Sequence, residues 1–143
     1  MDVLLRKTDD SARVPAFAHE GDSGLDIYSL EDTELKPLER KLVRTGISIE
    51  MPHGVEAQVR PKSGLALEHG ITLLNTPGTI DSSYRGEIKV LMINLGDKTY
   101  RVGKNKKIAQ LVFARVEKPR IVEVGSLSDT TRKDGGFGST GLD

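Results

Sequence analysis

The chain is short and its charges balance: its 143 residues include 21 Lys plus Arg and 21 Asp plus Glu, which leaves no net charge at pH 7. Such a length fits one domain with a modest core. Because there is neither a net positive charge nor a long basic block, the composition gives no support for binding to nucleic acid. The lack of Cys excludes a disulfide framework, a thiol nucleophile and a thiolate metal site.

The sequence carries no recognisable targeting or membrane segment. The first seven residues lack the apolar region of a signal peptide, and no later run approaches the roughly 20 apolar residues that a membrane span needs. We therefore expect a cytoplasmic protein that binds no membrane. The histidines are scattered without ligand spacing and are interpreted as solvated or structural residues; they are His19, His53 and His69.

Strands dominate the predicted elements, because the apolar residues are mainly Val, Ile and Leu in period-two patterns. The clearest alternation predicts one continuous strand over residues 43–50, and together with the next strand it indicates an antiparallel meander. A strand near residue 90 is apolar on both faces, which predicts burial on two sides. In chain order the predicted strands cover residues 3–7, 25–29, a short edge segment within 31–39, 43–50, 55–60, 71–74, 88–94, 100–102, 108–116 and 121–124.

The best helix candidate covers residues 63–68. Its interior residues are good helix formers, Ser63 is expected to cap its start, and Gly70 suits its end. Two cations, Arg60 and Lys62, precede the helix, where free backbone N–H groups favour an anion. A plain capped helix without a ligand is the alternative interpretation.

The stretch from residue 75 to residue 87 carries an unusual density of functional groups. A turn at Pro77-Gly78 leads into a β-prone run that ends in Asp81, and Tyr84 follows three residues later. Asp81 is expected to be half-buried at a strand end, where a carboxylate can accept a proton or orient a water molecule. Tyr84 offers a flat face to a sugar or a base. The alternative is an ordinary hairpin with a turn Asp and a packing Tyr.

The C-terminal segment changes character at Gly125. It has too little apolar surface to fold alone, so we divide the chain into a β-domain over 1–124 and a mobile glycine-rich arm over 125–143. The glycines allow N–H groups to converge on a phosphate, and Arg132, Ser139 and Thr140 add donors. A flexible linker is the alternative, although a linker has no need of the ring of Phe137.

Taken together, these residues provide anion-binding groups, an aromatic ring and a candidate base. A second carboxylate, Asp26, is able to hold Mg²⁺ through water. A nucleotide with a polyphosphate chain is the natural ligand for such a set. The cluster of lysines at 104–107 is interpreted by default as solvated.

Five motifs are spread over nearly the whole length of the chain. They are Gly24-Leu25-Asp26-Ile27-Tyr28-Ser29, Arg60-Pro61-Lys62-Ser63-Gly64-Leu65-Ala66, Gly78-Thr79-Ile80-Asp81-Ser82-Ser83-Tyr84-Arg85-Gly86-Glu87, Gly103 through Ile108-Ala109-Gln110-Leu111-Val112, and Arg132 through Gly141. In sequence and in order they resemble the motifs of the trimeric dUTPase (deoxyuridine triphosphate pyrophosphatase) family. The resemblance implies an all-β, jelly-roll-like β-barrel subunit with one short helix and a flexible C-terminal arm. It also implies a homotrimer whose active sites lie at subunit interfaces, each completed by an arm.

The same resemblance implies hydrolysis of dUTP to dUMP and pyrophosphate, which limits uracil in DNA and supplies dUMP for dTTP synthesis. Asp81 would activate the water that attacks the α-phosphorus, and Tyr84 would pack against the deoxyribose and exclude a 2′-hydroxyl. Asp26 would reach Mg²⁺ through water. The remaining implied substrate-binding residues are Asn75 and Gly78 at the uracil, Lys62, Ser63, Gly64 and Gln110 at the phosphates, and Arg132, Phe137, Gly138, Ser139 and Thr140 in the arm, where Phe137 would stack on the uracil.

Two positions depart from the family pattern. Lys62 stands where the family often has Arg, and a Lys offers a point charge without the bidentate fork. In the fourth motif, Lys106-Lys107 stands where an acidic residue followed by Arg is common. Two rival functions are a fold-related dCTP deaminase and a nucleotide sensor without catalysis. The glycine-rich arm and the pair of Asp81 and Tyr84 favour the dUTPase.

Overall fold

The computed structural model describes residues 1–136 and residue 139, and within them it contains eleven strands and one helix. No helix in these residues is long and apolar enough to cross a membrane. The elements are β1 (Leu4–Lys7), β2 (Leu25–Tyr28), β3 (Thr33–Leu35), β4 (Arg40–Arg44), β5 (Ile47–Glu50), β6 (Val55–Arg60), α1 (Ser63–His69), β7 (Ile71–Leu73), β8 (Gly78–Ile80), β9 (Lys89–Asn94), β10 (Tyr100–Val102) and β11 (Lys107–Arg115).

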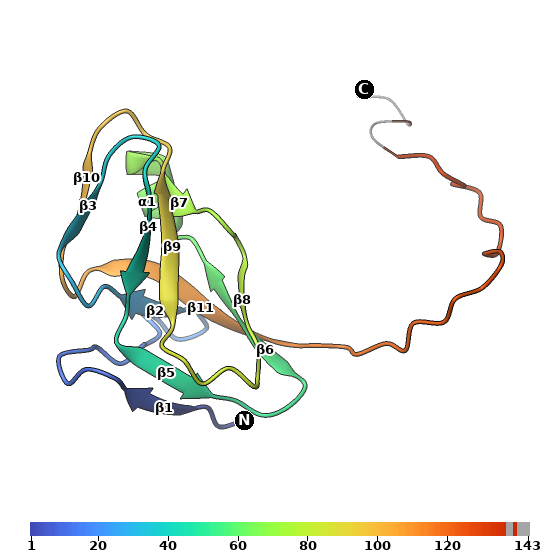
Figure 1. The fold of residues 1–143 in the computed structure, drawn as a ribbon, viewed down its shortest axis with the longest axis horizontal. Helices are drawn as coiled ribbons and strands as arrows, with labels where there is room; N and C mark the ends of the chain where they lie inside the picture. Colours follow the sequence, from blue (N-terminus) through green and yellow to red (C-terminus); the bar gives the residue numbers. More distant parts are fainter. Residues whose placement is uncertain (137–138, 140–143) are drawn as a thin grey trace.

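The strands form four small antiparallel sheets that pack together around one core (Figure 1). The largest sheet has the order β2-β11-β6-β8, the next has the order β4-β9-β7, and the two pairs are β1-β5 and β10-β3. The mostly-β architecture with one short helix confirms the predicted fold class. The predicted meander is wrong, because none of the described pairs joins strands that are consecutive in the chain. Pairing between distant strands is instead what brings separate motifs together.

Apolar side chains from all four sheets form the core. Alternate residues of β9 point inward, so that Val90 and Met92 are fully buried while Leu91 and Ile93 are only partly covered. The prediction that β9 is buried on both faces is therefore confirmed for one face, whereas the other face is only partly covered. Asn94 is buried beside them, and its side chain is fully satisfied, since it donates to backbone carbonyls and accepts an N–H. Other fully buried side chains include Ile27, Leu35, Val43, Ile71, Ile88 and Leu111.

The predicted continuous strand over residues 43–50 is wrong, because residues 45 and 46 interrupt it between the end of β4 and the start of β5. Gly46 has a φ of 70°, in the left-handed region that glycine adopts without strain. β4 then pairs with β9, whereas β5 pairs with β1 in another sheet. The apolar residues of the sequence keep their period of two across this interruption, and Val43, Ile47 and Ile49 all join the core, so periodicity alone does not reveal it. Ser48 is buried as well, so β5 is covered on both faces.

The bounds of the helix match the prediction to within one residue, but its N-cap residue differs from the predicted one. The N-cap position is Lys62, and the first helical residue is Ser63, so the predicted Ser63 cap is wrong. At the other end Gly70 has a φ of 67°, and its N–H donates to the carbonyl oxygen of Ala66 at 3.0 Å. No residue of α1 is buried, and Leu67 is 89% exposed.

Beyond β11 the chain leaves the body and runs away from it (Figure 1). The N–H of Val116 donates to the carbonyl oxygen of Gly54 at 3.0 Å, and the described residues after it form no backbone hydrogen bond with the body. The strand predicted for residues 121–124 is wrong: these residues form no strand, and Ile121 is 85% exposed. The division of the chain at residue 124 stays a prediction.

Candidate active site

Three motifs converge around β11. In the register of the largest sheet, Gln110 on β11 lies opposite Asp26 on β2 and opposite Arg60 on β6. Lys62 follows β6 directly, so the first, second and fourth motifs meet at one end of this sheet. A hollow of about 380 Å³ opens there, and its lining includes Gly24, Asp26, Lys62, Lys107 and Gln110.

Asp26 is the most buried charged group of this hollow, with 4% of its surface exposed. Its Oδ1 accepts a hydrogen bond from the Nζ of Lys62, and its Oδ2 lies 2.6 Å from the Nζ of Lys107. Burial raises the pKa of Asp26, but the hydrogen bonds from Lys107 and Lys62 outweigh it and hold the pKa below its usual value. The same carboxylate raises the pKa of Lys107. Both shifts favour the charged forms of Asp26 and Lys107.

Gln110 fits closely against its neighbours. Its Nε2 donates to the carbonyl oxygen of Pro61 at 3.0 Å, which ties β11 to the segment that leads into α1. A Cβ at Gly24 would lie 2.2 Å from the Oε1 of Gln110, so only glycine leaves room for this amide. Ser63 and Gly64 stand next in the chain as the first two residues of α1, and both are exposed.

A second group of predicted site residues lies along β8 and the turn after it. Gly78 begins β8, and a Cβ there would lie 3.3 Å from the Nδ2 of Asn75 and 3.4 Å from the Cβ of Val59. Asp81 follows the strand, and its carbonyl oxygen accepts the N–H of Tyr84 at 3.0 Å in a tight turn. Asp81 thus lies at a strand end as predicted, but in the single chain this residue is exposed rather than half-buried.

The ring of Tyr84 is held across this turn. Its hydroxyl donates to the carbonyl oxygen of Glu87 at 3.0 Å, and 45% of the residue is exposed. A Cβ at Gly86 would lie 2.4 Å from that hydroxyl oxygen, so the ring occupies the space above Gly86. The carboxylate of Glu87 is itself fixed by the guanidinium of Arg44 and the N–H of Gly46.

The two groups lie at opposite ends of β6. Gly78 pairs with Val59 and Ile80 pairs with Ala57, so the next residue, Asp81, falls opposite Glu56. The second motif begins at the other end, at Arg60. Four residue steps along a strand, at about 3.3 Å each, separate these ends by about 13 Å. One chain therefore does not bring Asp81 next to the phosphate-binding candidates.

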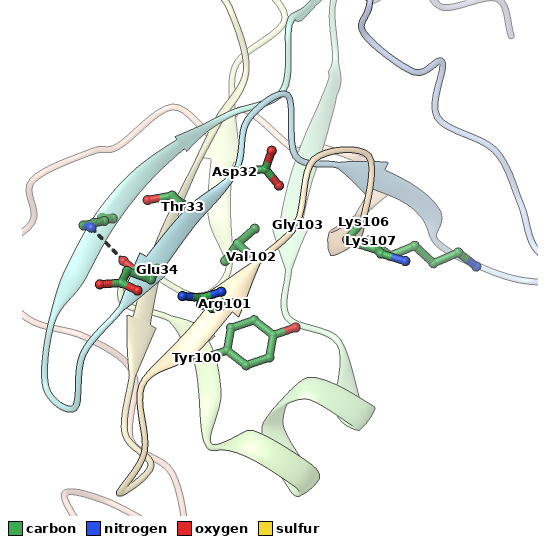
Figure 2. A pocket seen from close by; sticks show the side chains of 10 residues that line it. Asp32, Thr33, Glu34, Tyr100, Arg101, Val102, Gly103, Lys106 and Lys107 are labelled. Carbon is green, nitrogen blue, oxygen red and sulfur yellow. Dashed lines mark hydrogen bonds between the residues drawn. The ribbon is translucent and has the colours of Figure 1, made fainter.

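A larger hollow of about 930 Å³ is lined by residues of the paired strands β3 and β10 and of the loop that follows β10 (Figure 2). It mixes acidic and basic side chains, and it contains none of the residues predicted to bind substrate. In Figure 2 the side chains of Lys106 and Lys107 extend away from Tyr100 and Arg101. Lys107 lines both hollows. The motif residues, and not the volume, therefore identify the candidate site.

The described part of the arm does not contact the site through hydrogen bonds. The Nε of Arg132 donates to the carbonyl oxygen of Gly135 at 2.8 Å, and the N–H of Ser139 donates to the carbonyl oxygen of Gly136 at 3.0 Å. The predicted roles of Phe137, Gly138 and Thr140 lie outside the described residues.

Sequence reasoning missed one residue of this site, because it treated the lysines at 104–107 as solvated. That interpretation is wrong for Lys107, which pairs with Asp26. The register explains the miss: β11 has a bulge between Lys107 and Ala109, which sets Lys107 opposite Tyr28. Opposite residues share a sheet face, so the bulge turns Lys107 toward the side of Asp26 and Gln110.

The chain is similar to known proteins along its whole length. The dUTPase family model matches residues 10–141. The protein named deoxyuridine 5′-triphosphate nucleotidohydrolase from Clostridium kluyveri is 57% identical over 141 residues, covering 99% of both chains. The protein of the same name from Clostridium novyi is 54% identical over 142 residues, covering 99% of this chain and 100% of that one.

Solved structures show the same fold. A mutant of the Staphylococcus bacteriophage 80alpha dUTPase with dUpNHpp superimposes with a TM-score of 0.92 at 24% identity, covering 99% of each chain. The dUTPase from phage phi11 of S. aureus gives a TM-score of 0.83 at 22% identity, covering 91% of this chain and all of that one. Because the family model spans most of the sequence and full-length relatives exceed 50% identity, the chain belongs to the dUTPase family, as its five motifs predicted.

Proposed function

We propose that this chain hydrolyses dUTP to dUMP and pyrophosphate in the cytoplasm, limiting uracil in DNA and supplying dUMP for dTTP synthesis. The observation that carries the proposal is the 57% identity, over 99% of both chains, to a protein named deoxyuridine 5′-triphosphate nucleotidohydrolase. In the proposed reaction a water molecule oriented by Asp81 attacks the α-phosphorus, and pyrophosphate leaves. Catalysis then depends mainly on positioning and on neutralising phosphate charge.

Asp81 suits the role of the base because its carboxylate is available. Within residues 1–136 and 139, no hydrogen bond or ion pair engages its side-chain oxygens. The turn to Tyr84 fixes the backbone on which the carboxylate stands. Tyr84, tethered through its hydroxyl, packs against the deoxyribose and leaves no space for a 2′-hydroxyl, while Asn75 and the backbone at Gly78 read the uracil edge.

The hollow at the end of β11 is the proposed phosphate site. Lys62 supplies a positive charge, Ser63 and Gly64 supply exposed backbone N–H groups and a hydroxyl, and Gln110 supplies an amide. The first N–H groups of a helix have no partner inside the helix, so they are free to donate to phosphate oxygens. The close fit of Gln110 over Gly24 supports a rigid wall on one side of the bound phosphates.

The active unit is a homotrimer with sites between copies. The separation of Asp81 from Lys62 by the length of β6 supports this, since one α-phosphorus cannot contact both ends of a strand in one chain. The arm over 125–143 then closes each site, where Arg132, Ser139 and Thr140 grip phosphates and Phe137, beside Gly138, stacks on the uracil.

Mg²⁺ fits this site as a companion of the triphosphate and not as a resident ion. No group of three or more His, Asp or Glu side chains that could hold a metal occurs in the described residues. Asp26 is the residue that would reach the ion through water, since each carboxylate oxygen bonded to a lysine keeps a second acceptor direction. When bound, Mg²⁺ neutralises phosphate charge and orients phosphate oxygens.

The direct test is pyrophosphate release from dUTP in the presence of Mg²⁺, compared with dTTP, dCTP and UTP. We expect turnover of dUTP alone; ammonia released from dCTP, or tight dUTP binding without turnover, would refute the proposal in favour of a deaminase or a sensor.

The Asp81→Asn variant tests the assigned base. It should bind dUTP like the native chain but lose a factor of about 10²–10⁴ in kcat, the usual contribution of a general base. Asp97→Asn, in the turn after β9, is the matched control and should keep full activity. Undiminished turnover in Asp81→Asn would remove Asp81 from the mechanism.

A further inference from the structure

Two lysines share one buried carboxylate in the proposed phosphate site. Lys62 approaches Oδ1 of Asp26 from the segment after β6, and Lys107 approaches Oδ2 from the start of β11. Both ammonium groups are partly open, since the side chains of Lys62 and Lys107 are 28% and 46% exposed while that of Asp26 is 6% exposed. The carboxylate is thus at the base of the cluster, with the cations nearer to solvent.

The chemistry of lysine suits this sharing. An ammonium group has three donors, so one hydrogen bond to Asp26 leaves two for another acceptor. An arginine in bidentate contact would occupy both carboxylate oxygens, whereas each lysine takes only one. Lysine at both positions therefore lets one carboxylate hold two cations, one on each oxygen.

The charges of this trio favour an anion in the hollow. Two positive charges and one negative charge leave the trio with a net charge of +1 beside the amide of Gln110, which lines the same 380 Å³ space. Asp22 also lines this space, and its Oδ2 is engaged by His19, accepting its N–H at 2.9 Å and lying 3.5 Å from its Nδ1. Without Asp26 the two ammonium groups would repel each other and turn toward solvent. Without Lys107 the remaining pair would be neutral and would attract a polyphosphate weakly.

We propose that Lys107 binds phosphate together with Lys62, and that Asp26 is a positioning residue that holds both ammonium groups at the hollow. The inference rests on the proposed function, because the hollow is the phosphate site of that reaction. It gives Lys107 a role in phosphate binding, and it makes the three residues one energetic unit.

The test measures binding of inorganic tripolyphosphate by calorimetry with metal removed by chelation, so that neither the base nor Mg²⁺ contributes. Lys107→Met should weaken binding on the order of tenfold, the loss of one charge-assisted hydrogen bond. Lys106→Met is the matched control: it removes a neighbouring lysine that makes no ion pair with Asp26, and it should change binding less than twofold, a few tenths of a kcal/mol.

Whether Asp26→Asn weakens or strengthens tripolyphosphate binding distinguishes two roles of Asp26: holding the two ammonium groups in place, or only adding a negative charge to the hollow. In the native background Asp26→Asn should weaken tripolyphosphate binding, because an amide cannot hold two ammonium groups. In the Lys107→Met background the same change should strengthen binding, because it restores the net charge of +1. If Asp26 served only a metal ion, its removal would strengthen metal-free binding in both backgrounds.

Native affinity in Lys107→Met, or strengthening by Asp26→Asn in both backgrounds, would overturn the inference. Lys107 is nearly half exposed, so its variant is expected to fold and decides the matter even if Asp26→Asn does not fold. Turnover of dUTP by the native chain is measured in parallel. Native turnover with unchanged tripolyphosphate binding in Lys107→Met would refute the role of Lys107 and leave the proposed function standing.

Discussion

Glycines at this site act by leaving space for a neighbouring side chain. A Cβ at Gly24 would collide with the amide of Gln110, and one at Gly86 would collide with the ring of Tyr84. Neither glycine has a positive φ, so the backbone conformation does not demand glycine at either position. Each glycine therefore sets where one side chain of the proposed substrate site can lie.

Gly86→Ala should displace the ring of Tyr84 and relax discrimination against the 2′-hydroxyl. The added methyl would sit 2.4 Å from the hydroxyl oxygen, so the ring must swing away and its hydrogen bond to the Glu87 carbonyl must break. We expect the ratio of kcat/KM for dUTP over UTP to fall on the order of tenfold, equivalent to about 1–2 kcal/mol of lost steric exclusion.

Gly125→Ala is the control for that measurement, since a Cβ there meets nothing within 4 Å. It should keep the native ratio. A native ratio in Gly86→Ala as well would show that Tyr84 does not select the sugar.

At the level of elements, one glycine determines how the sheets are divided. Gly46 lets the chain leave β4 and start β5, and its N–H and carbonyl oxygen are bonded to Glu87 and Thr8. A Cβ there would lie 2.8 Å from that of Ala12 and 3.0 Å from the Cδ1 of Leu30. Any side chain at position 46 would therefore meet both backbone strain and crowding in the core.

Gly46→Ala should be strongly destabilising, and Gly54→Ala separates the two causes. Both glycines have positive φ, 70° and 79°, but a Cβ at Gly54 meets nothing within 4 Å. Gly54→Ala should cost only the left-handed strain, about 1–2 kcal/mol. Gly46→Ala should cost about 1–3 kcal/mol more through overpacking. Urea unfolding of both variants measures the difference, and equal losses would mean that the core around Ala12 adapts without cost.

The sequence patterns predicted most strands and the helix, but they did not predict how the strands pair. Alternation reports which face of a strand is buried, and it continues across Gly46 because both halves face the same core. It contains no information on partners, so a meander was predicted where β11 lies between β2 and β6. The bulge that turns Lys107 toward Asp26 is likewise a property of pairing. The strand predicted for 121–124 is rich in β-branched residues, but it pairs with no strand in the part of the chain that the structure describes.

At the level of the whole molecule, the single chain keeps two groups of proposed site residues apart. The turn with Asp81 and the hollow with Lys62 lie at opposite ends of β6. The motifs in the sequence predict a set of site residues, and that set stays a prediction; the motifs alone do not show that one chain keeps its two groups apart. Only the strand register makes the separation visible.

Mixed oligomers test whether two copies complete each other. Asp81→Asn lacks the base, and the double variant Lys62→Met with Ser63→Ala lacks two phosphate contacts; alone, each should be nearly inactive. If each site takes Asp81 from one copy and the phosphate contacts from another, random assembly by unfolding and refolding an equal mixture should leave about one site in four with both sets intact. Pyrophosphate release from dUTP should then recover to roughly a quarter of the native rate, while each variant refolded alone stays inactive. If both sets instead came from the same copy, every site in the mixture would carry one defect, and no activity would return.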